Sequence, residues 1–442
     1  MSARSIIDEL LKGRLSVRMQ EGSLAIVGPK ENITPAVVEL VRNNKAILVA
    51  YLEGSGDLGM SLPGDGAAEN DLGIRPGGQR SPRKLRQLDF SLFYFGNACE
   101  RQQRASTVYD LLLRGAAYAD LNGYSAVWVP ERHFDEFGGL YPSPATLAAA
   151  LAVITKNIGI RAGSVVVPLH HPVRIAEDWS VVDNLSGGRV GIACASGWHP
   201  NDFVLAPENY LRRREVVFEH IGIIQQLWRG EKVAMVDGGG AEKSVRLFPR
   251  PVRAELPVWI TSAGKADTFA SAGRTGAMVL THLLGENLEQ LEEKIRIYRK
   301  AYHDAGHPQG GDKVALMLHT YVGENEEDVL ARARKPFISY LRSSLGLMRN
   351  LAASLGIDAD AGRITAEDLE GMLDYAFTRY ISHSSLIGGR EKMIGMLYRL
   401  SDIGVDEVAC LIDFGIDERS VMKGLEDLTI LKDTYLKEVN LL

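Results

Sequence analysis

The apolar run Ala126-Val127-Trp128-Val129-Pro130 is followed directly by Glu131-Arg132-His133-Phe134-Asp135-Glu136-Phe137-Gly138. A short continuous apolar run is typical of a strand that is buried on both faces of a parallel sheet. The second string places charged and imidazole side chains where that strand ends. In parallel barrels the functional side chains come from the carboxyl ends of the strands. The stretch therefore predicts a chemical site at the mouth of a barrel.

The alternation of strand and helix continues over residues 86–442. Apolar runs predict eight strands, at 88–95, 125–129, 159–167, 189–195, 256–261, 277–281, 314–322 and 405–412. Amphipathic segments predict helices between them, for example at 104–122, 144–156, 172–185, 208–229, 286–305 and 390–403. The pattern predicts an α/β fold, a (β/α)8 TIM-like barrel with insertions.

Two insertions are expected in this barrel. Residues 230–250 are Gly-rich and hairpin-like, and residues 340–380 are helical in pattern. A doubly wound open sheet is the alternative architecture. It is disfavoured because no Gly-x-Gly-x-x-Gly follows the first strand.

Residues 1–52 form a separate patterned module. A helix over Ile6–Leu11, strands at 15–19 and 24–27 with a turn at 20–23, and a second helix capped by Thr34 with Pro35 at its first position are expected. Residues 53–85 are rich in Gly and Pro and poor in large apolar residues, so they are interpreted as a flexible linker.

The composition sets the class of protein. The formal net charge of -6 gives no field that would favour nucleic acid. No apolar run approaches the roughly 18 to 20 residues that span a bilayer, and residues 1–12 lack a signal-peptide core. Cys99, Cys194 and Cys410 show no metal-ligand spacing. We expect a reduced, cytoplasmic protein with no membrane association and no metal.

Four further sequence segments either follow a predicted strand or begin a predicted helix. Gly163-Ser164 lies in the third strand, and His170-His171 follow it. We assign these histidines to a loop that packs against the barrel, although alone they can be read as metal ligands. The other three strings are Arg189 to His199, Tyr210 to Glu215, and Pro257 to Lys265. Arginine at a helix start can grip a phosphate bidentately, and backbone amides at a helix start form an anion site.

Together these strings resemble the luciferase-like flavin monooxygenases over about residues 88–435, most closely the subgroup found beside nonribosomal peptide and polyketide synthases. That family ends its second strand in Glu-His-His-Phe, whereas this chain has Arg132 at the first histidine. Leu386 to Glu391 resembles the family's Gly-x-Pro-Glu helix start, without the proline. The resemblance implies a fold, a cofactor and a set of site residues.

The implied cofactor is reduced FMN, which reacts with O2 to give a C4a-peroxyflavin. The implied catalytic residues are His133 as the proton-transfer group, Arg132 as an electrostatic stabiliser and Glu131 as its pair or as the orienting group of His133. An ion pair between Glu131 and Arg132 that only holds the loop is the alternative. The implied cofactor-binding residues are Gly163, Ser164, Ala195, Ser196, Gly197, Trp198, Arg214, Ser262, Ala263, Gly264 and His282. Small side chains would let the backbone approach the flavin ring, and Arg214 with Ser262–Gly264 would clamp the phosphate.

Residues 1–52 resemble a TubC-type N-terminal docking domain. That resemblance implies a nonribosomal peptide or polyketide synthetase subunit as partner, bound by strand addition, and a substrate tethered to a carrier protein. Hydroxylation at carbon, N-oxidation and Baeyer–Villiger insertion remain open. The barrel resemblance further implies a homodimer and a separate flavin reductase, since no nicotinamide fingerprint is present. The alternatives are a deazaflavin-dependent hydride-transfer enzyme on the same barrel and a non-catalytic adaptor of the assembly line.

Overall fold

The computed structural model describes residues 16–20, 23–27, 34, 37–38, 40–41, 86–96, 108–283, 286–343 and 366–441. The chain divides into two compact units. One comprises residues 1–83 with 344–376, and the other comprises residues 84–343 with 377–442. Each unit is described by itself.

The first unit contains an antiparallel hairpin. Strand β1 (Ser16–Gln20) pairs with β2 (Ser23–Val27), and Gln20 lies opposite Ser23 across a two-residue connection. The predicted hairpin is present at the expected residues. The carbonyl of Thr34 accepts a hydrogen bond from the amide of Val38 at 3.0 Å, as expected at a helix start. The predicted helix over Ile6–Leu11 and the linker 53–85 lie outside the described residues.

The second unit contains a closed parallel barrel of eight strands. The strands are β3 (Asp89–Phe93), β4 (Ala126–Val129), β5 (Gly159–Val166), β6 (Val190–Ala195), β9 (Val258–Ser262), β10 (Met278–His282), β11 (Val314–Gly323) and β13 (Glu407–Leu411). They pair in that order, and β13 pairs with β3 to close the sheet. All eight predicted strands are confirmed to within two residues at each end, because continuous apolar runs mark strands that are covered on both faces.

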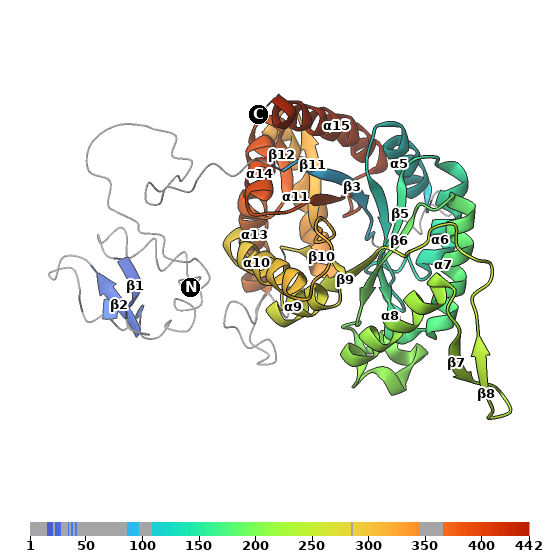
Figure 1. Ribbon diagram of the computed structural model, residues 1–442. Coiled ribbons are helices and arrows are strands. Elements are labelled where there is room, and N and C mark those ends of the chain that lie inside the picture. The colour runs from blue at the N-terminus through green and yellow to red at the C-terminus, as the bar shows by residue number, and fades with distance from the viewer. Residues whose placement is uncertain are drawn as a thin grey trace. The chain divides into compact units, whose positions relative to one another are not determined.

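Helices lie around the outside of the strands (Figure 1). They are α5 (Asp110–Leu121), α6 (Pro144–Ile154), α7 (Pro172–Ser186), α8 (Arg213–Arg229), α9 (Ala266–Arg274), α10 (Leu288–Asp304), α11 (Glu326–Ser343), α14 (Arg390–Asp402) and α15 (Glu418–Leu441). A further helix, α13 (Ala366–His383), has residues in both units. Helix α7 begins at a proline and is followed by Gly187 at φ 67°, a left-handed position that glycine adopts without steric cost.

Three parts of the barrel unit differ from, or extend, the sequence prediction. Leu386–Gly389 is a strand, β12, which pairs with Thr320–Gly323 of β11, and the predicted helix begins directly after it at Arg390. Helix α8 begins at Arg213 rather than at residue 208, because residues 207–209 form a separate 3-10 turn. The hairpin expected within 230–250 is present as β7 (Val233–Val236) and β8 (Glu242–Val245) and projects from the barrel (Figure 1).

The interior of the barrel is filled near the start of its strands. The rings of Trp128 and Trp259 meet edge to face with centroids 5.1 Å apart, and the guanidinium of Arg161 lies 4.9 and 4.7 Å from those centroids. Arg161 also pairs with Glu407 at 2.6 Å. A barrel interior that is packed in this way leaves the opposite, carboxyl end of the strands for chemistry.

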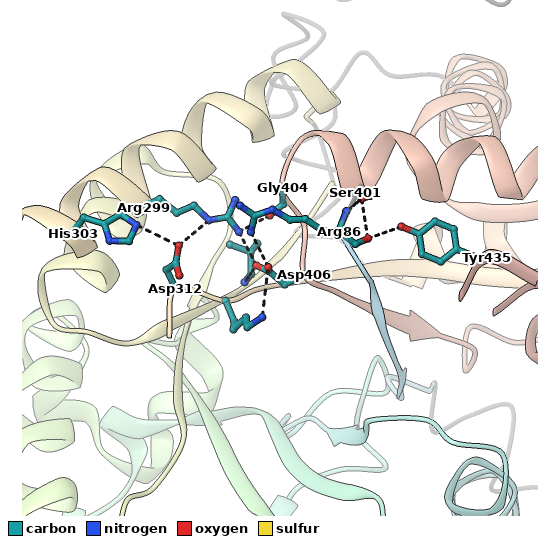
Figure 2. A network of polar contacts seen from close by, with 10 residues as sticks. Arg86, Arg299, His303, Asp312, Ser401, Gly404, Asp406 and Tyr435 are labelled. Atoms are coloured by element: carbon teal, nitrogen blue, oxygen red, sulfur yellow. Dashed lines mark hydrogen bonds and ion pairs between the residues drawn. The ribbon is translucent and has the colours of Figure 1, made fainter. Parts of the chain in front are cut away.

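A polar network holds the amino-terminal ends of β11 and β13 together (Figure 2). The buried carboxylate of Asp406 accepts hydrogen bonds from Arg299 and from the amide of Val314, both at 2.8 Å, and from Arg86 at 3.2 Å. Arg299 also reaches Asp312 at 3.1 Å. These contacts connect α10 to two strand starts, so we assign this end of the barrel to stability. Among the described residues, none of the helices has the length and apolarity needed to cross a membrane.

Candidate active site

The carboxylate of Glu131 is the centre of the polar cluster at the barrel mouth. Glu131 follows β4 directly, and its side chain is fully buried. One oxygen, Oε1, lies 2.8 Å from Nε2 of His133 and 2.5 Å from Nε2 of His170. The other, Oε2, accepts the amide of Val166 at 2.6 Å. The end of β4, the end of β5 and the turn after β5 therefore meet at one carboxylate.

The electrostatics of this cluster keep Glu131 ionised. Burial alone would raise the pKa of Glu131, but the hydrogen bonds from His133, His170 and the Val166 amide outweigh it and lower the pKa. Burial would likewise lower the pKa of His170, but the hydrogen bond and charge of Glu131 raise it. Both imidazoles accordingly point an N–H at the same anionic oxygen.

Arg132 points away from this carboxylate. Its side chain is buried and forms ion pairs with Asp202 and with Asp135, the latter at 2.8 Å. The guanidinium lies 5.3 Å from the ring centroid of Trp198. The alternative of a Glu131–Arg132 ion pair is wrong, because Arg132 pairs with Asp135 and Asp202 whereas Glu131 contacts His133 and His170. Within the described residues, Nε of Arg132 is buried with no hydrogen-bond partner.

The pair Gly163–Ser164 lies in β5 and is joined by a cis peptide bond. The hydroxyl of Ser164 lies 2.6 Å from that of Thr261 on β9, so these side chains meet across β6. A Cβ at Gly163 would lie 2.7 Å from the ring of Phe93 and 3.0 Å from Cβ of Trp128. Core packing alone therefore requires glycine here, whereas the predicted contact of Gly163 with a flavin ring stays a prediction.

The segment after β6 places an aromatic ring at the mouth. Ala195, Ser196 and Gly197 are half-buried, and Trp198 is 52% exposed. Gly197 adopts φ 73°, and a Cβ there would lie 2.8 Å from the ring of Phe203 and 2.9 Å from the side chain of Val166. This close packing turns the chain outward, and the exposed indole face of Trp198 is available to a planar ligand.

The two halves of the expected phosphate clamp are separate. Arg214, in the first turn of α8, is exposed and makes no hydrogen bond or ion pair within the described part of the chain. Ser262 ends β9, and its hydroxyl accepts the amide of Gly264 at 3.3 Å just before α9. Ala263 between them is exposed.

A carboxylate already lies against this bend. A Cβ at Gly264 would clash with Oε1 of Glu286, which is paired with Lys294. The start of α9 thus attracts anionic groups, as helix starts do. The exposed Ala263 at this helix start leaves room for a phosphate, but Glu286 opposes its charge.

His282 is the last residue of β10, and His319 lies within β11. Burial, with Lys294 nearby, lowers the pKa of His282 to about 4. Burial and the proximity of His282 lower the pKa of His319 to about 3. The rings of Phe337, Tyr340 and Phe414 surround His319 with centroids 4.9 to 5.5 Å away. Both imidazoles are therefore neutral at physiological pH.

The luciferase-like monooxygenase profile matches residues 89–407, most of the chain and nearly the whole barrel. The chain belongs to the luciferase-like monooxygenase family. It is an enzyme of that family, and the closed eight-stranded barrel agrees with the resemblance in its sequence.

Relatives of the luciferase-like family align over most of the barrel. The oxygenase component of the flavin-dependent trigonelline monooxygenase of Acinetobacter baylyi is 25% identical over 345 residues, which cover 77% of this chain and 93% of that protein. The 4-hydroxyprotoasukamycin monooxygenase of Streptomyces nodosus subsp. asukaensis is 32% identical over 223 residues, which cover 49% of this chain and 59% of that protein.

Solved structures share the fold. Monooxygenase RslO1 from Streptomyces bottropensis superposes with a TM-score of 0.62 at 20% identity, covering 78% of this chain and 98% of that one. The oxygenating constituent of 3,6-diketocamphane monooxygenase from Pseudomonas putida, solved with FMN, gives a TM-score of 0.59 at 18% identity, covering 78% and 96%. An F420-dependent secondary alcohol dehydrogenase gives 0.57 at 17% identity, covering 78% and 98%.

Three polar residues of the mouth were not among the predicted site residues of this luciferase-like barrel. His170 is predicted only as part of a loop, and neither Asp202 nor His319 is among the predicted site residues. The available signal was position alone: His170 and Asp202 each follow a predicted strand by a few residues, and His319 lies in the second half of one. Such positions converge at a barrel mouth.

Proposed function

We propose that this monooxygenase uses reduced FMN and O2 to oxygenate an intermediate tethered to a carrier protein of a nonribosomal peptide or polyketide assembly line. The residues that gather at the carboxyl end of the barrel support the use of a flavin. Ser164 and Thr261, the exposed ring of Trp198 and the Glu131–His133 pair all belong to the carboxyl ends of β4, β5, β6 and β9 or to the residues directly after them. This is where barrel enzymes bind their ligands.

His133 and Arg132 have different roles in the proposed reaction. When bound, reduced flavin supplies the electrons that activate dioxygen. His133, 10% exposed, holds a proton at Nε2 against the ionised Glu131 and is the group placed to give or take it. The positive charge of Arg132, buried beside Trp198, favours negative charge that develops at the mouth.

We assign the flavin phosphate to the Ser262–Gly264 bend at the start of α9, with Arg214 as its counter-charge. Helix starts and arginine forks are the two protein features that best match a phosphate. The described residues carry no nicotinamide fingerprint, and we propose that a separate reductase delivers the reduced flavin.

The assembly-line part of the proposal rests on residues 1–52. The β1–β2 hairpin is a two-stranded sheet, and the edge of such a sheet can accept a further strand. Residues 1–52 contain seven Lys or Arg and five Asp or Glu, so this segment carries two excess positive charges although the whole chain has a net charge of -6. A slightly basic segment suits an acidic partner tail.

We also propose a homodimer. Helices α6 and α7 expose large apolar side chains: Val153 is 70% exposed, Leu185 50%, and Ile154 and Val181 45% each. An apolar patch on adjoining helices is typical of an interaction surface.

Anaerobic loading of the protein with reduced FMN, followed by 18O2 and carrier-bound substrates, tests the proposed reaction. One 18O atom in the product supports it. The same mass change with substrates that carry no carrier protein would keep the oxygenase and reject the tethered substrate. No oxygen transfer to any substrate, with hydrogen peroxide as sole product, would contradict it.

A hydride-transfer enzyme is the second candidate, because the F420-dependent dehydrogenase shares this fold. It predicts reduction of a deazaflavin by an alcohol or a similar donor, with no oxygen uptake. A barrel that binds neither flavin nor deazaflavin but still binds a synthetase subunit would favour the non-catalytic adaptor.

A further inference from the structure

We infer that Glu131, His133 and His170 form a binding site for one divalent transition-metal ion of the zinc class. The three ligand atoms are Oε1 of Glu131 and Nε2 of each histidine. They all lie within 4.8 Å of one another. Within the residues that the structure describes, which include all ten histidines, no other set of three His, Cys, Asp or Glu side chains converges in this way.

The three ligands are held in place by the fold. Glu131 directly follows β4, and the amide of Val166 at the end of β5 fixes its second oxygen at 2.6 Å. His170 follows the 3-10 turn at residues 167–169, whose residues are buried. A carboxylate that is itself hydrogen-bonded is the usual orienting arrangement for metal ligands. The ligand atoms are therefore preorganised rather than gathered from mobile side chains.

The spacing suits a small ion. Oε1 lies 2.8 Å from one Nε2 and 2.5 Å from the other. Tetrahedral zinc with bonds of about 2.1 Å places its ligands roughly 3.4 Å apart. Each of the two Glu131–histidine pairs must therefore separate by less than about 1 Å, with the ion taking the place of the protons that now lie between these atoms.

The chemical types of the three ligands determine which metal ions this site can bind. Two imidazoles and one carboxylate are ligands that Zn2+ and Co2+ prefer, whereas Mg2+ and Ca2+ require oxygen ligands. His170 is 32% exposed and His133 10% exposed, so solvent can reach the cluster and supply a fourth ligand. Three protein ligands with one open position is the arrangement of an accessible rather than a closed zinc site.

Occupation of this site would inactivate the oxygenase, because the ion would take the Nε2 of His133 that we assign to proton transfer. This consequence rests on the proposed function, but the binding does not.

Equilibrium dialysis of the tag-free full-length protein against Zn2+, with bound metal measured by mass spectrometry, tests the site. Visible absorption with Co2+ then reports its geometry. We expect one equivalent in the wild type and visible absorption bands typical of tetrahedral Co2+. Affinity should fall at least tenfold in His170→Ala and in His170→Gln, which keeps an N–H for Glu131. The matched variant His171→Ala, which alters the exposed neighbouring histidine, should bind as the wild type does.

Two results would overturn the site: no metal bound at micromolar Zn2+, or equal binding by the wild type and both His170 variants. Oxygenase assays separate the two inferences. Loss of Zn2+ inhibition in His170→Gln supports both, whereas a wild type that binds Zn2+ but never transfers oxygen keeps the metal site and rejects the proposed reaction.

Discussion

Arg132 and Asp202 form a buried ion pair that joins the segment after β4 to the segment after β6. Their side chains are 2% and 4% exposed. Because the same guanidinium lies over Trp198, the pair also sets the position of the exposed ring at the mouth. A charge pair at this depth stabilises the fold only while both partners are present.

We expect Asp202→Ala to lower the free energy of unfolding by about 3 kcal/mol, because it leaves a buried guanidinium with Asp135 as its one remaining carboxylate. Glu293→Ala breaks the exposed pair with Arg296 on α10 and should lower the free energy of unfolding far less, because solvent screens this pair. Urea unfolding of both variants measures the difference. Equal losses would show that burial of the Arg132 pair does not matter.

We expect His133→Ala to lower oxygenase turnover by about 10²- to 10⁴-fold, the range for loss of a proton-transfer group. Its affinity for FMN should change little, because the phosphate and the ring are held by other residues. His171→Ala is the control, since this neighbouring histidine is exposed and outside the cluster. Single-turnover kinetics measure the effect. Unchanged turnover in His133→Ala would remove His133 from the mechanism.

Substitutions of Arg214 and of Glu286, which lie near the expected phosphate, should change the affinity for FMN in opposite directions. Arg214→Ala should weaken FMN binding about tenfold or more, since a charged hydrogen bond contributes about 1.5 to 3 kcal/mol. Glu286→Gln should tighten it, because it removes a like charge beside Gly264. Riboflavin has no phosphate and is the control ligand in the same titrations. If Arg214→Ala weakens both ligands equally, Arg214 does not contact the phosphate.

Acid should destabilise the barrel through His319. Its pKa is lowered to about 3 in the folded state, whereas the unfolded chain binds the proton near pH 6.5. The unfolded state therefore gains protons first as the pH falls, and stability is lost by about 1.4 kcal/mol per pH unit below about 6. His319→Phe keeps an aromatic ring among Phe337, Tyr340 and Phe414 but cannot titrate.

The measurement is urea unfolding at pH 7.5 and 5.5. The loss of stability between the two values should be smaller in His319→Phe than in the wild type by about 1 kcal/mol. An identical loss in both proteins would show that His319 is not responsible.

The barrel was predictable because its strands are encoded locally. Runs such as Ala126–Val129 are apolar at every position, which only a doubly covered strand requires. Strand β12 was missed because two of its four residues are glycines, and its pairing partner lies 66 residues earlier on β11. Nothing local marks such a pairing.

The site was predictable only in part, for the same reason. Glu131 and His133 are two residues apart and were found together. The contact between Glu131 and His170 spans 39 residues and depends on β4 and β5 lying side by side. The Glu286 carboxylate reaches Gly264 through the fold of the segment after β10, and sequence spacing does not report that approach.

The most direct test is a crystal structure of the protein with FMN. We predict that the isoalloxazine lies at the carboxyl end of the barrel, against Ser164 and Trp198 and within hydrogen-bond or van der Waals reach of His133, with the phosphate at the Ser262–Gly264 bend. FMN bound at any other place, or a mouth closed by packed side chains, would contradict the account.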